Sequence, residues 1–521
     1  MILSQIDLIV IALYCIGLIG ISYWVSREEA GHEKNSADYF LASKSLPWWA
    51  IGASLIAANI SAEQIIGMSG SGYALGLGIA AYEWMAAITL LLVGKYFIPV
   101  FLKQGIYTMP QFLEQRYDTR VKLTMAIFWI GVYVLVNLTS VLYLGALAMN
   151  TITGFSITDC LLFLAIFSVV YSIYGGLKAV AFTDIIQVVL LVFGGLLVSY
   201  LALDKIAEGA GSWAGFQTLL IAVPEKFDLI LSRDNPHYMS LPGISVLIGG
   251  MWVMNFSYWG FNQYITQRAL AAKNLAEAQK GIIFGAFLKL LMPLIVVIPG
   301  VAAVVLVPDL HRPDEAFPEM MKLVPHGLLG IVFAALIAAI ASSLSSMTNS
   351  ISTIFTLDIY KPLINPDASE GRLVMVGRLI AVGAMTCAVI IAEPLLGNFE
   401  QAFQYIQEFT GFFTPGIVVI FTLGIFWKKT TANAALAAAI SSAVLSLALK
   451  IFWPELPFMD RVSVVFLACI AIAVAISLIE KGEDHDKAVN LKEMNFSTST
   501  SYNVASLAIV LILVGLYATW W

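Results

Sequence analysis

The sequence predicts an all-α integral membrane protein. Of its 521 residues, 60% are hydrophobic and only 12% are charged, whereas about 25% of the residues in a soluble domain are charged. Apolar runs long enough to cross a bilayer recur about fourteen times. Two of these runs carry polar residues and glycines near their centres, which indicates helices that are broken at membrane depth. We therefore expect a helical bundle built around two broken spans.

The expected spans follow the apolar runs in chain order. They are residues 7–25, 48–75, 77–103, 121–150, 157–177, 181–204, 244–268, 277–306, 326–358, 374–396, 399–426, 430–452, 461–479 and 503–521. Lysine and arginine are concentrated in alternate connections, beginning with the one that holds Arg27, Lys34 and Lys44. Because positively charged connections stay in the cytoplasm and the number of spans is even, we expect both termini to lie outside.

The second expected span is the first broken one. Its sequence, WWAIGASLIAANISAEQIIGMSGSG, has polar side chains where the hydrocarbon centre should be, namely Asn59, Ser61, Glu63 and Gln64. Unpaired polar groups in lipid cost several kcal/mol, so such a segment survives only where it lines a cavity or packs inside protein. We expect two half-helices joined near Ile60, with freed carbonyls available to a cation and side chains available to a polar solute.

The span at 244–268 is interrupted in a similar way. Its sequence GGMWVMNFSYWGFNQY sets five polar residues among glycines, namely Asn255, Ser257, Tyr258, Asn262 and Gln263. Five crossings separate this span from the first broken one, so the two run in opposite directions and indicate an inverted repeat. Paired interruptions in corresponding spans of two halves are the best sequence indication of a transporter's binding site.

Other classes of function find less support in the sequence. The net charge of -6 is not accompanied by a basic run, which argues against a nucleic-acid partner. The four cysteines lie in apolar segments with unrelated spacing, so they suggest neither disulfides nor a metal cluster. No histidine lies in the interior of a span, since His326 is only the first residue of one, and no nucleophile or phosphate-loop motif is present, so we expect no enzymatic activity. A channel is the second alternative, but broken helices in an inverted repeat favour alternating access.

Several polar residues inside the spans are candidates for solute binding. Gln64 and Glu83 lie in neighbouring spans, close in sequence to Asn59, Tyr82 and Trp84. Amides and carboxylates beside aromatic rings suit a sugar, whose hydroxyls exchange hydrogen bonds while its C–H face stacks on a ring. The alternative is that these groups only hold helices together. For Glu63 we favour a structural role next to the break.

Two later spans add further solute candidates. Lys289 stands alone in FGAFLKLLMPLIVV, so burial requires partners from another span, and its ammonium group is available to a solute hydroxyl. The alternative is a lysine that extends to the membrane surface. Gln407 follows Phe403 by four residues and shares its helix face, which suits an amide beside an aromatic lid as well as ordinary packing.

The segment AAIASSLSSMTNS is a candidate cation site. Ala339, Ser342, Ser343 and Ser346 fall on one helix face, with Ser345 beside Ser342. Hydroxyls and free carbonyls form the oxygen shell that a small hard cation needs. The alternative is close helix packing, in which small residues are common. Near the start of another span, Asp184 is an equally good helix cap or cation ligand.

Five motifs together resemble the sodium:solute symporter family. They are SLIAANISAEQ with GMSGSGY, YGGLKAVAFTDIIQ, WGFNQYITQR, SSLSSMTNS with TLDIYK, and FQYIQEFTGFFTPG with FWKKT. The resemblance covers nearly the whole chain and implies one transporter domain over 1–521. Within it, one helix at 7–25 precedes inverted repeats of five spans each at 48–204 and 244–426, and three helices at 430–521 follow.

The resemblance also implies a function and a partner set. It implies a symporter that imports a neutral hexose, galactose or glucose, with sodium across the bacterial cytoplasmic membrane, as a monomer or weak dimer. The alternatives within the family are carriers of sialic acid, myo-inositol or proline, and a sugar-gated channel or sensor. The amides and the carboxylate among the candidate residues favour a neutral hexose over a zwitterion, which would require opposite charges.

Site residues follow from the motifs by resemblance. The implied sodium ligands are the carbonyls of Ala57, Ile60 and Ala339 and the hydroxyls of Ser342 and Ser343. The implied sugar contacts are Gln64, Glu83, Asn255, Lys289 and Gln407, with Asn59 beside them. The implied inner gate is Tyr258, and the implied outer lid is Met68, Tyr82 and Phe403. Ala86 and Ser257 depart from the galactose carriers of the family, which have serine and tyrosine at these positions.

A second sodium site is also expected from the resemblance. Two-ion members of the family resemble this chain at Asp184, Ser342, Ser345 and Ser346. Each extra charge moved inward down 100 mV adds about 2.3 kcal/mol of driving force. We therefore expect two sodium ions per solute.

Overall fold

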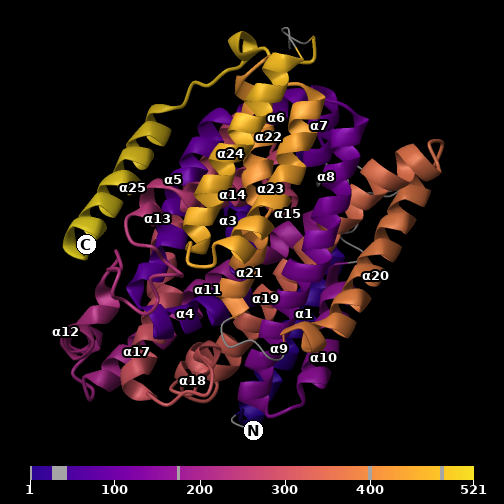
Figure 1. The fold of residues 1–521 in the computed structure, drawn as a ribbon. Helices are drawn as coiled ribbons and strands as arrows, with labels where there is room; N and C mark the ends of the chain where they lie inside the picture. Colours follow the sequence, from indigo (N-terminus) through magenta and orange to yellow (C-terminus); the bar gives the residue numbers. More distant parts are fainter. Residues whose placement is uncertain (1–2, 26–43, 173–175, 397–401, 481–485) are drawn as a thin grey trace.

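The structure is a computed structural model that describes residues 3–25, 44–172, 176–396, 402–480 and 486–521 (Figure 1). The helices, numbered as in the figure, are α1 (Gln5–Val25), α3 (Trp48–Asn59), α4 (Ser69–Leu75), α5 (Ala81–Tyr96), α6 (Ile98–Gln104), α7 (Met109–Arg116), α8 (Thr119–Val132), α9 (Thr139–Thr153), α10 (Ile157–Ser172), α11 (Gly176–Ile206), α12 (Ser212–Ala222), α13 (Ser245–Ile248), α14 (Gly250–Phe261), α15 (Gln263–Leu270), α16 (Leu275–Met292), α17 (Ile298–Leu306), α18 (Ala316–Met321), α19 (Leu328–Ile354), α20 (Glu370–Leu396), α21 (Ala402–Gly411), α22 (Thr414–Phe426), α23 (Ala432–Phe452), α24 (Phe458–Ile479) and α25 (Thr500–Thr519).

Shorter helical segments join several of these helices. The π-helical segments are Glu63–Met68, Tyr133–Leu138, Pro293–Val297 and Phe355–Ile364, and the 3-10 segments are Leu77–Ala80, Pro224–Phe227, Pro313–Glu315 and Leu491–Glu493. Within the described residues, β-type pairing is limited to one isolated bridge between Leu46 and Ala272. The predicted all-α class is therefore confirmed.

The number of membrane crossings is established only in part. Among the described residues, ten helical stretches are long and apolar enough to cross a membrane, and two bent pairs raise the number to twelve. Two predicted spans are not among these twelve. One contains α10, which is shorter and precedes the undescribed residues 173–175, and the other contains the interrupted pair α14 and α15. The count of fourteen, the repeat boundaries and the orientation remain predictions. Arg27 and Lys34, on which the orientation partly depends, lie outside the described residues.

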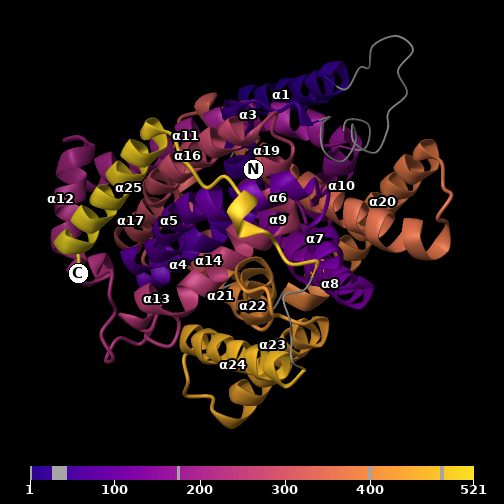
Figure 2. The same ribbon diagram turned by 90° about the horizontal axis from the view of Figure 1, so that it is seen from above.

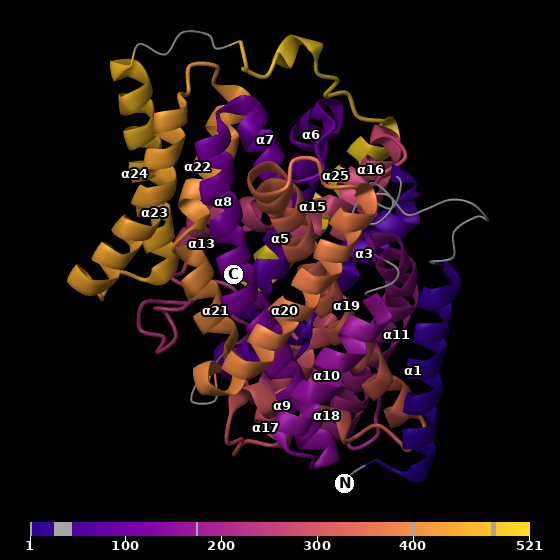
Figure 3. The ribbon, with the colours of Figure 1, turned by 90° about the vertical axis from the view of Figure 1, so that its right-hand side faces the viewer.

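Viewed from above, α1, α12, α20, α24 and α25 lie at the edge (Figure 2). The side view shows α23 and α24 on the far side of the molecule from α1 (Figure 3). The end of α25 is anchored, since Leu229 N donates to Trp520 O at 3.0 Å. The C-terminal helix therefore ends against the connection at 205–243.

The first broken helix bends where the sequence predicts. Helix α3 ends at Asn59, and the chain turns by 61° before the helix resumes at Glu63. Ile60 has φ -74° and ψ 80°, outside the helical region. Ser61 Oγ accepts a hydrogen bond from the backbone N–H of Glu63 at 3.1 Å and so pairs one amide freed by the break. The predicted joint near Ile60 is confirmed.

The second half of this broken helix, which contains α4, is held by close packing. A Cβ added to Gly300 in α17 would lie 2.0 Å from the carbonyl oxygen of Ser69 in α4. A Cβ added to Gly70 would lie 2.5 Å from the carboxylate of Asp314. Both contacts are shorter than any side chain tolerates. Glycine at these two positions therefore allows α4 to pack closely against α17 and against the segment that contains Asp314.

The second broken helix is interrupted at Asn262, between α14 and α15. Asn262 is extended, with ψ 124°. Tyr133 stabilises the interruption, because its hydroxyl donates to Asn262 Oδ1 at 2.7 Å and accepts from Gln263 N at 2.9 Å. An aromatic hydroxyl from a neighbouring span thus pairs backbone and side-chain groups that a continuous helix would not expose.

A third break was not predicted. The sequence suggested one continuous span at 399–426, of which residues 399–401 lie outside the described part. The structure instead bends by 49° between α21 and α22. Pro415 lies in the first turn of α22, a position that suits a helix start but would interrupt a continuous helix. Ser442 Oγ donates to the freed carbonyl of Phe412 at 2.9 Å.

Candidate functional site

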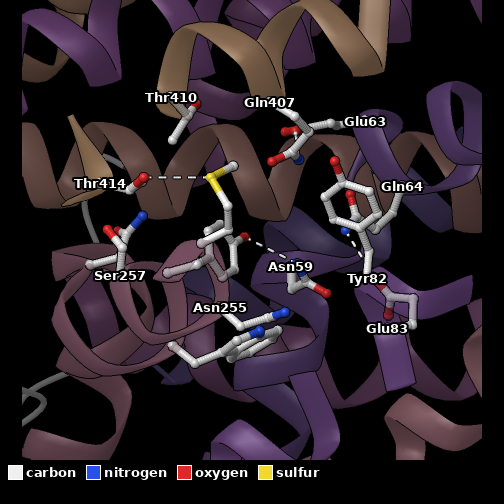
Figure 4. A pocket seen from close by; sticks show the side chains of 14 residues that line it. Asn59, Glu63, Gln64, Tyr82, Glu83, Asn255, Ser257, Gln407, Thr410 and Thr414 are labelled. Atoms are coloured by element: carbon white, nitrogen blue, oxygen red, sulfur yellow. Dashed lines mark hydrogen bonds between the residues drawn. The ribbon is translucent and has the colours of Figure 1, made fainter. Parts of the chain in front are cut away.

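The central cavity lies beside the first break and has a volume of about 70 Å³. It is lined by Asn59, Glu63, Gln64, Tyr82, Glu83, Met254, Asn255, Ser257, Tyr258, Trp259, Asn262, Gln407, Thr410 and Thr414. Figure 4 shows Gln407 and Thr410 on one side of the cavity and Asn255 on another, with Gln64 and Glu83 to their right. The structure therefore brings together the predicted solute residues from α5, α14, α21 and the first broken helix.

A buried ion pair lies at this cavity, with Glu83 in the lining and Lys289 behind it. Lys289 Nζ lies 2.5 Å from Glu83 Oε2, and both side chains are at most 2% exposed. The ammonium group also donates to Asn59 Oδ1 and lies 4.7 Å from the ring centre of Trp259. Gln64 Nε2 donates to the other carboxylate oxygen of Glu83 at 3.1 Å. Lys289 is therefore paired inside the protein and does not extend to the membrane surface.

Tyr258 lines the cavity about one helical turn before the second break at Asn262. Its hydroxyl accepts hydrogen bonds from Asn59 Nδ2 at 3.1 Å and from the hydroxyl of Tyr264 at 2.8 Å. These bonds connect α3 to α14 and α15, the two broken helices. The predicted gate residue is therefore in place to respond when either broken helix moves.

Glu63 lies next to the break, as expected, and it also lines the cavity. Its side chain accepts a hydrogen bond from Gln407 Nε2 at 3.3 Å, and the structural role favoured for it stays a prediction. Glu63 is the first residue of the π-helical segment that ends at Met68. The helical periodicity of the sequence gave no sign of this segment.

Two of the predicted lid residues, Tyr82 and Phe403, pack against each other, and Tyr82 lines the cavity. The rings of Tyr82 and Phe403 meet edge to face, with their centres 5.2 Å apart. Phe403 and Met68 are fully buried. Phe403 lies on Gly67, where an added Cβ would be 2.9 Å from the Phe403 Cβ.

The serine face of α19 lies against the last turn of α3. Ser343 Oγ is 3.1 Å from the carbonyl oxygen of Ala58 and 3.5 Å from that of Ala57. Because α3 stops at Asn59, these carbonyls lie at a helix end, where backbone oxygens lack the donors of a continuing helix. Ala339 lies one turn before Ser343 on the same buried face. Hydroxyl and carbonyl oxygens are thus placed together as a small cation requires.

Asp184 is fully buried beside this face. The Ser342 hydroxyl donates to Asp184 Oδ1, and Ser54 Oγ donates to Asp184 Oδ2 at 2.5 Å. Helix α11 begins at Gly176, about two turns before Asp184, so the alternative of a helix cap is wrong. Ser345 points elsewhere, since its hydroxyl donates to the carbonyl of Ser168 at 3.3 Å.

Arg268 lies next to Asp184 and was not predicted from the sequence as a site residue. The guanidinium group of Arg268 is fully buried, and its Nη2 is 3.9 Å from Asp184 Oδ2. The same nitrogen donates to the Ser346 hydroxyl, and Nε donates to Ser54 Oγ at 3.1 Å. The only signal in the sequence was a charged residue at the end of an expected span.

Comparison with known proteins identifies the family. The profile of the sodium:solute symporter family matches residues 39–441. The chain is 51% identical to the sodium/glucose cotransporter of Vibrio parahaemolyticus, over 100% of this chain and 99% of that protein. It is 32% identical to the human sodium/myo-inositol cotransporter, over 85% of this chain and 66% of that protein.

A solved structure supports the same fold. A sodium-coupled sialic acid symporter in its outward-open state superposes with a TM-score of 0.80 at 23% identity, over 91% of this chain and 98% of that one. The resemblance seen in the sequence motifs is thus confirmed, and so is coupling to sodium. The chain belongs to the sodium:solute symporter family and is a sodium-coupled, multi-pass membrane transporter.

Proposed function

We propose that the protein imports a neutral hexose, galactose or glucose, together with sodium across the bacterial cytoplasmic membrane by alternating access. The observation that carries the proposal is the buried pair of Glu83 and Lys289 among the amides of Gln64 and Asn59. Each of these groups exchanges hydrogen bonds, and the pair adds no net charge. Such a wall suits a solute with many hydroxyls and no charge.

The charges around the cavity also distinguish between candidate solutes. The described lining includes two carboxyl side chains, Glu63 and Glu83, and neither lysine nor arginine. Lys289, behind the lining, is already paired. An anionic solute such as sialic acid would face Glu63 without a free cation, so the cavity favours a neutral sugar. Myo-inositol shares the chemistry of a neutral polyol, and a relative named for its transport is 32% identical.

Aromatic side chains complete the proposed sugar site. Tyr82, Tyr258 and Trp259 line the cavity, and their faces suit the apolar C–H face of a sugar ring. Gln407 and Asn255 supply the remaining proposed hydrogen-bonding groups. Ala86, at a position where galactose carriers of the family have serine, removes one hydroxyl contact worth about 0.5–1.5 kcal/mol.

The small cavity requires movement during transport. A water molecule needs roughly 10–15 Å³ of such space, so a cavity of about 70 Å³ holds a few waters and no hexose. We assign the outer movement to the lid of Met68, Tyr82 and Phe403, and the inner movement to Tyr258. In this proposal, loops and half-helices close around the solute and exclude water.

We place the coupled sodium ion between the first break and α19. The proposed ligands are the carbonyls of Ala57, Ile60 and Ala339 and the hydroxyls of Ser342 and Ser343. The geometry that supports this placement is the contact of Ser343 Oγ with the carbonyls at the end of α3. Sodium would then hold α3 against α19, which stabilises the broken helix on which Asn59 and Gln64 are carried.

Counterflow in proteoliposomes tests the choice of solute. Vesicles loaded with unlabelled sugar should take up labelled galactose or glucose in the presence of sodium, and myo-inositol, proline and sialic acid should compete weakly. Gln407→Ala should weaken apparent hexose affinity up to about tenfold, the effect of one lost hydrogen bond. Gln404→Ala on the same helix is the matched control, because Gln404 does not line the cavity. Preference for another solute would overturn the assignment of a hexose.

A further inference from the structure

Glu63 is a buried acidic side chain that has no cationic partner in the described part of the chain. It is 8% exposed, and Gln407 Nε2 donates to its Oε1 at 3.3 Å. Within the described residues, Oε2 accepts no hydrogen bond and no ion pair involves this carboxyl group. Two other buried acids, Glu83 and Asp184, are each paired with a buried cation. A buried charge is costly unless a partner compensates for it, so a cation beside Glu63 would be stabilised.

The carboxyl group of Glu63 lies at the cavity proposed for the solute. Figure 4 shows Glu63 next to Gln407 and apart from Glu83. The described lining holds these two carboxyl groups and neither lysine nor arginine, and Lys289 compensates only Glu83. With Glu63 ionised, the cavity therefore carries one uncompensated negative charge. Little water screens that charge, so its attraction for a positively charged group of the solute is strong.

Hydrogen-bond acceptors are also in excess in this lining. Oε2 of Glu63 is unused, and the buried hydroxyl of Tyr82 has no hydrogen-bond partner among the described residues. A sugar hydroxyl brings one donor, whereas an ammonium group brings three donors and a charge. The groups left without partners in this lining therefore suit an ammonium group better than a hydroxyl.

We propose that the cavity also takes amino hexoses, in which an ammonium group replaces one hydroxyl, and that this ammonium group pairs with Glu63 during transport. The inference rests on the proposed hexose function and extends it from neutral sugars to cationic ones. The remaining hydroxyls and the C–H face of the sugar use the contacts proposed for galactose. Because the ammonium group moves inward with the sugar, a negative interior potential favours its uptake more than that of galactose.

Calorimetric binding to the purified protein in sodium tests the pairing. The probes are galactose and the aminodeoxygalactoses that carry the amine in place of each hydroxyl in turn, at a pH where the amine is protonated. A hydrogen bond between charged groups is about twice as strong as a neutral one, so at least one probe should bind the wild type about tenfold more tightly than galactose. Glu63→Gln should abolish this preference, and Glu63→Asp should retain part of it because the charge remains.

The ratio of the two affinities is the quantity compared, because it does not change when a variant weakens the binding of all sugars equally. Glu408→Gln is the matched control. Glu408 follows Gln407 in α21, but it does not line the cavity and lies 2.6 Å from Arg461. The ratio in this variant should equal that of the wild type.

Transport in proteoliposomes provides a second readout that a purely structural role of Glu63 would not affect. Charge movement and uptake of labelled sugar are measured together for galactose and for the tightest amino sugar. Each molecule of amino sugar should carry one more elementary charge than a molecule of galactose, whatever the number of coupled sodium ions. Equal charge per molecule would mean that the amino sugar crosses uncharged or displaces a sodium ion, and either result would overturn the inference.

Three further results would overturn it. They are the absence of any amino sugar that the wild type prefers to galactose, a preference that persists unchanged in folded Glu63→Gln, and an amino sugar that binds but is not carried. Normal galactose binding without a preference for the amine would refute this inference alone. Failure of the wild type to bind galactose and all the amino sugars would instead refute the proposed hexose function.

Discussion

Replacing Lys289 by a neutral residue should destabilise the protein more than replacing an exposed lysine does. Lys289 and Glu83 are both at most 2% exposed, with their charged atoms 2.5 Å apart. Removing one partner of a buried pair leaves an uncompensated charge and costs about 3–5 kcal/mol. Each 1.4 kcal/mol is a factor of about ten in an equilibrium constant. Lys289→Met and Glu83→Gln should therefore each reduce the ratio of folded to unfolded protein by about a hundredfold or more.

The double variant distinguishes the pair from its separate groups. With both charges removed, no uncompensated charge remains, so the combined loss should be smaller than the sum of the two single losses by about 2 kcal/mol or more. Hexose transport should still be lost, since both side chains are proposed sugar contacts. Lys280→Met on the same helix is the control. Lys280 is 55% exposed and lies 3.7 Å from Glu277, and exposed pairs contribute about 1 kcal/mol or less.

Denaturant unfolding in detergent micelles measures these changes, with uptake in proteoliposomes measured in parallel. Strictly additive losses in the double variant, or a Lys289→Met effect no larger than that of Lys280→Met, would refute the pairing as a stabilising contact.

The remaining predictions concern the sodium site, the gate and the packing of α4. Ser343→Ala should lower apparent sodium affinity and abolish sodium-driven uptake while the protein stays folded; unchanged sodium activation would exclude this site. Tyr258→Phe keeps the ring but loses bonds to Asn59 and Tyr264, so it should retain more transport than Tyr258→Ala, and equal activities would show that the ring does not contact solute. Gly300→Val should lower thermal stability by overlap with Ser69, and a wild-type unfolding temperature would contradict the close packing.

The sequence predicted those features that are marked by a polar residue inside an apolar segment. Asn59, Ser61 and Gln64 interrupt an otherwise hydrophobic span, and the cost of unpaired polar groups in lipid places a break there. The break near Ile60 was found for this reason. Similarly, Lys289 is an isolated charge in an apolar run, which predicts a buried partner without identifying it.

Features that depend on contacts between distant segments were not predicted. Arg268 stood at the end of an expected span, where a charge is ordinary, and only the packing of α15 against α3 and α19 shows that it is buried beside Asp184. Glu63 accepts a hydrogen bond from Gln407, which is 344 residues further along the chain. The bend before α22 lies next to Pro415, which was not interpreted as a helix break in the sequence. In each case the decisive interaction joins residues that hydrophobic patterning treats independently.

Accumulation of labelled galactose in proteoliposomes under an inward sodium gradient tests the central claim most directly. The wild type should raise internal galactose above the external concentration, and an equal potassium gradient should not. Ser343→Ala should remove the accumulation, whereas Gln404→Ala should leave it intact. Accumulation that is independent of sodium, or that persists in Ser343→Ala, would contradict the account of a hexose carried with an ion bound between α3 and α19.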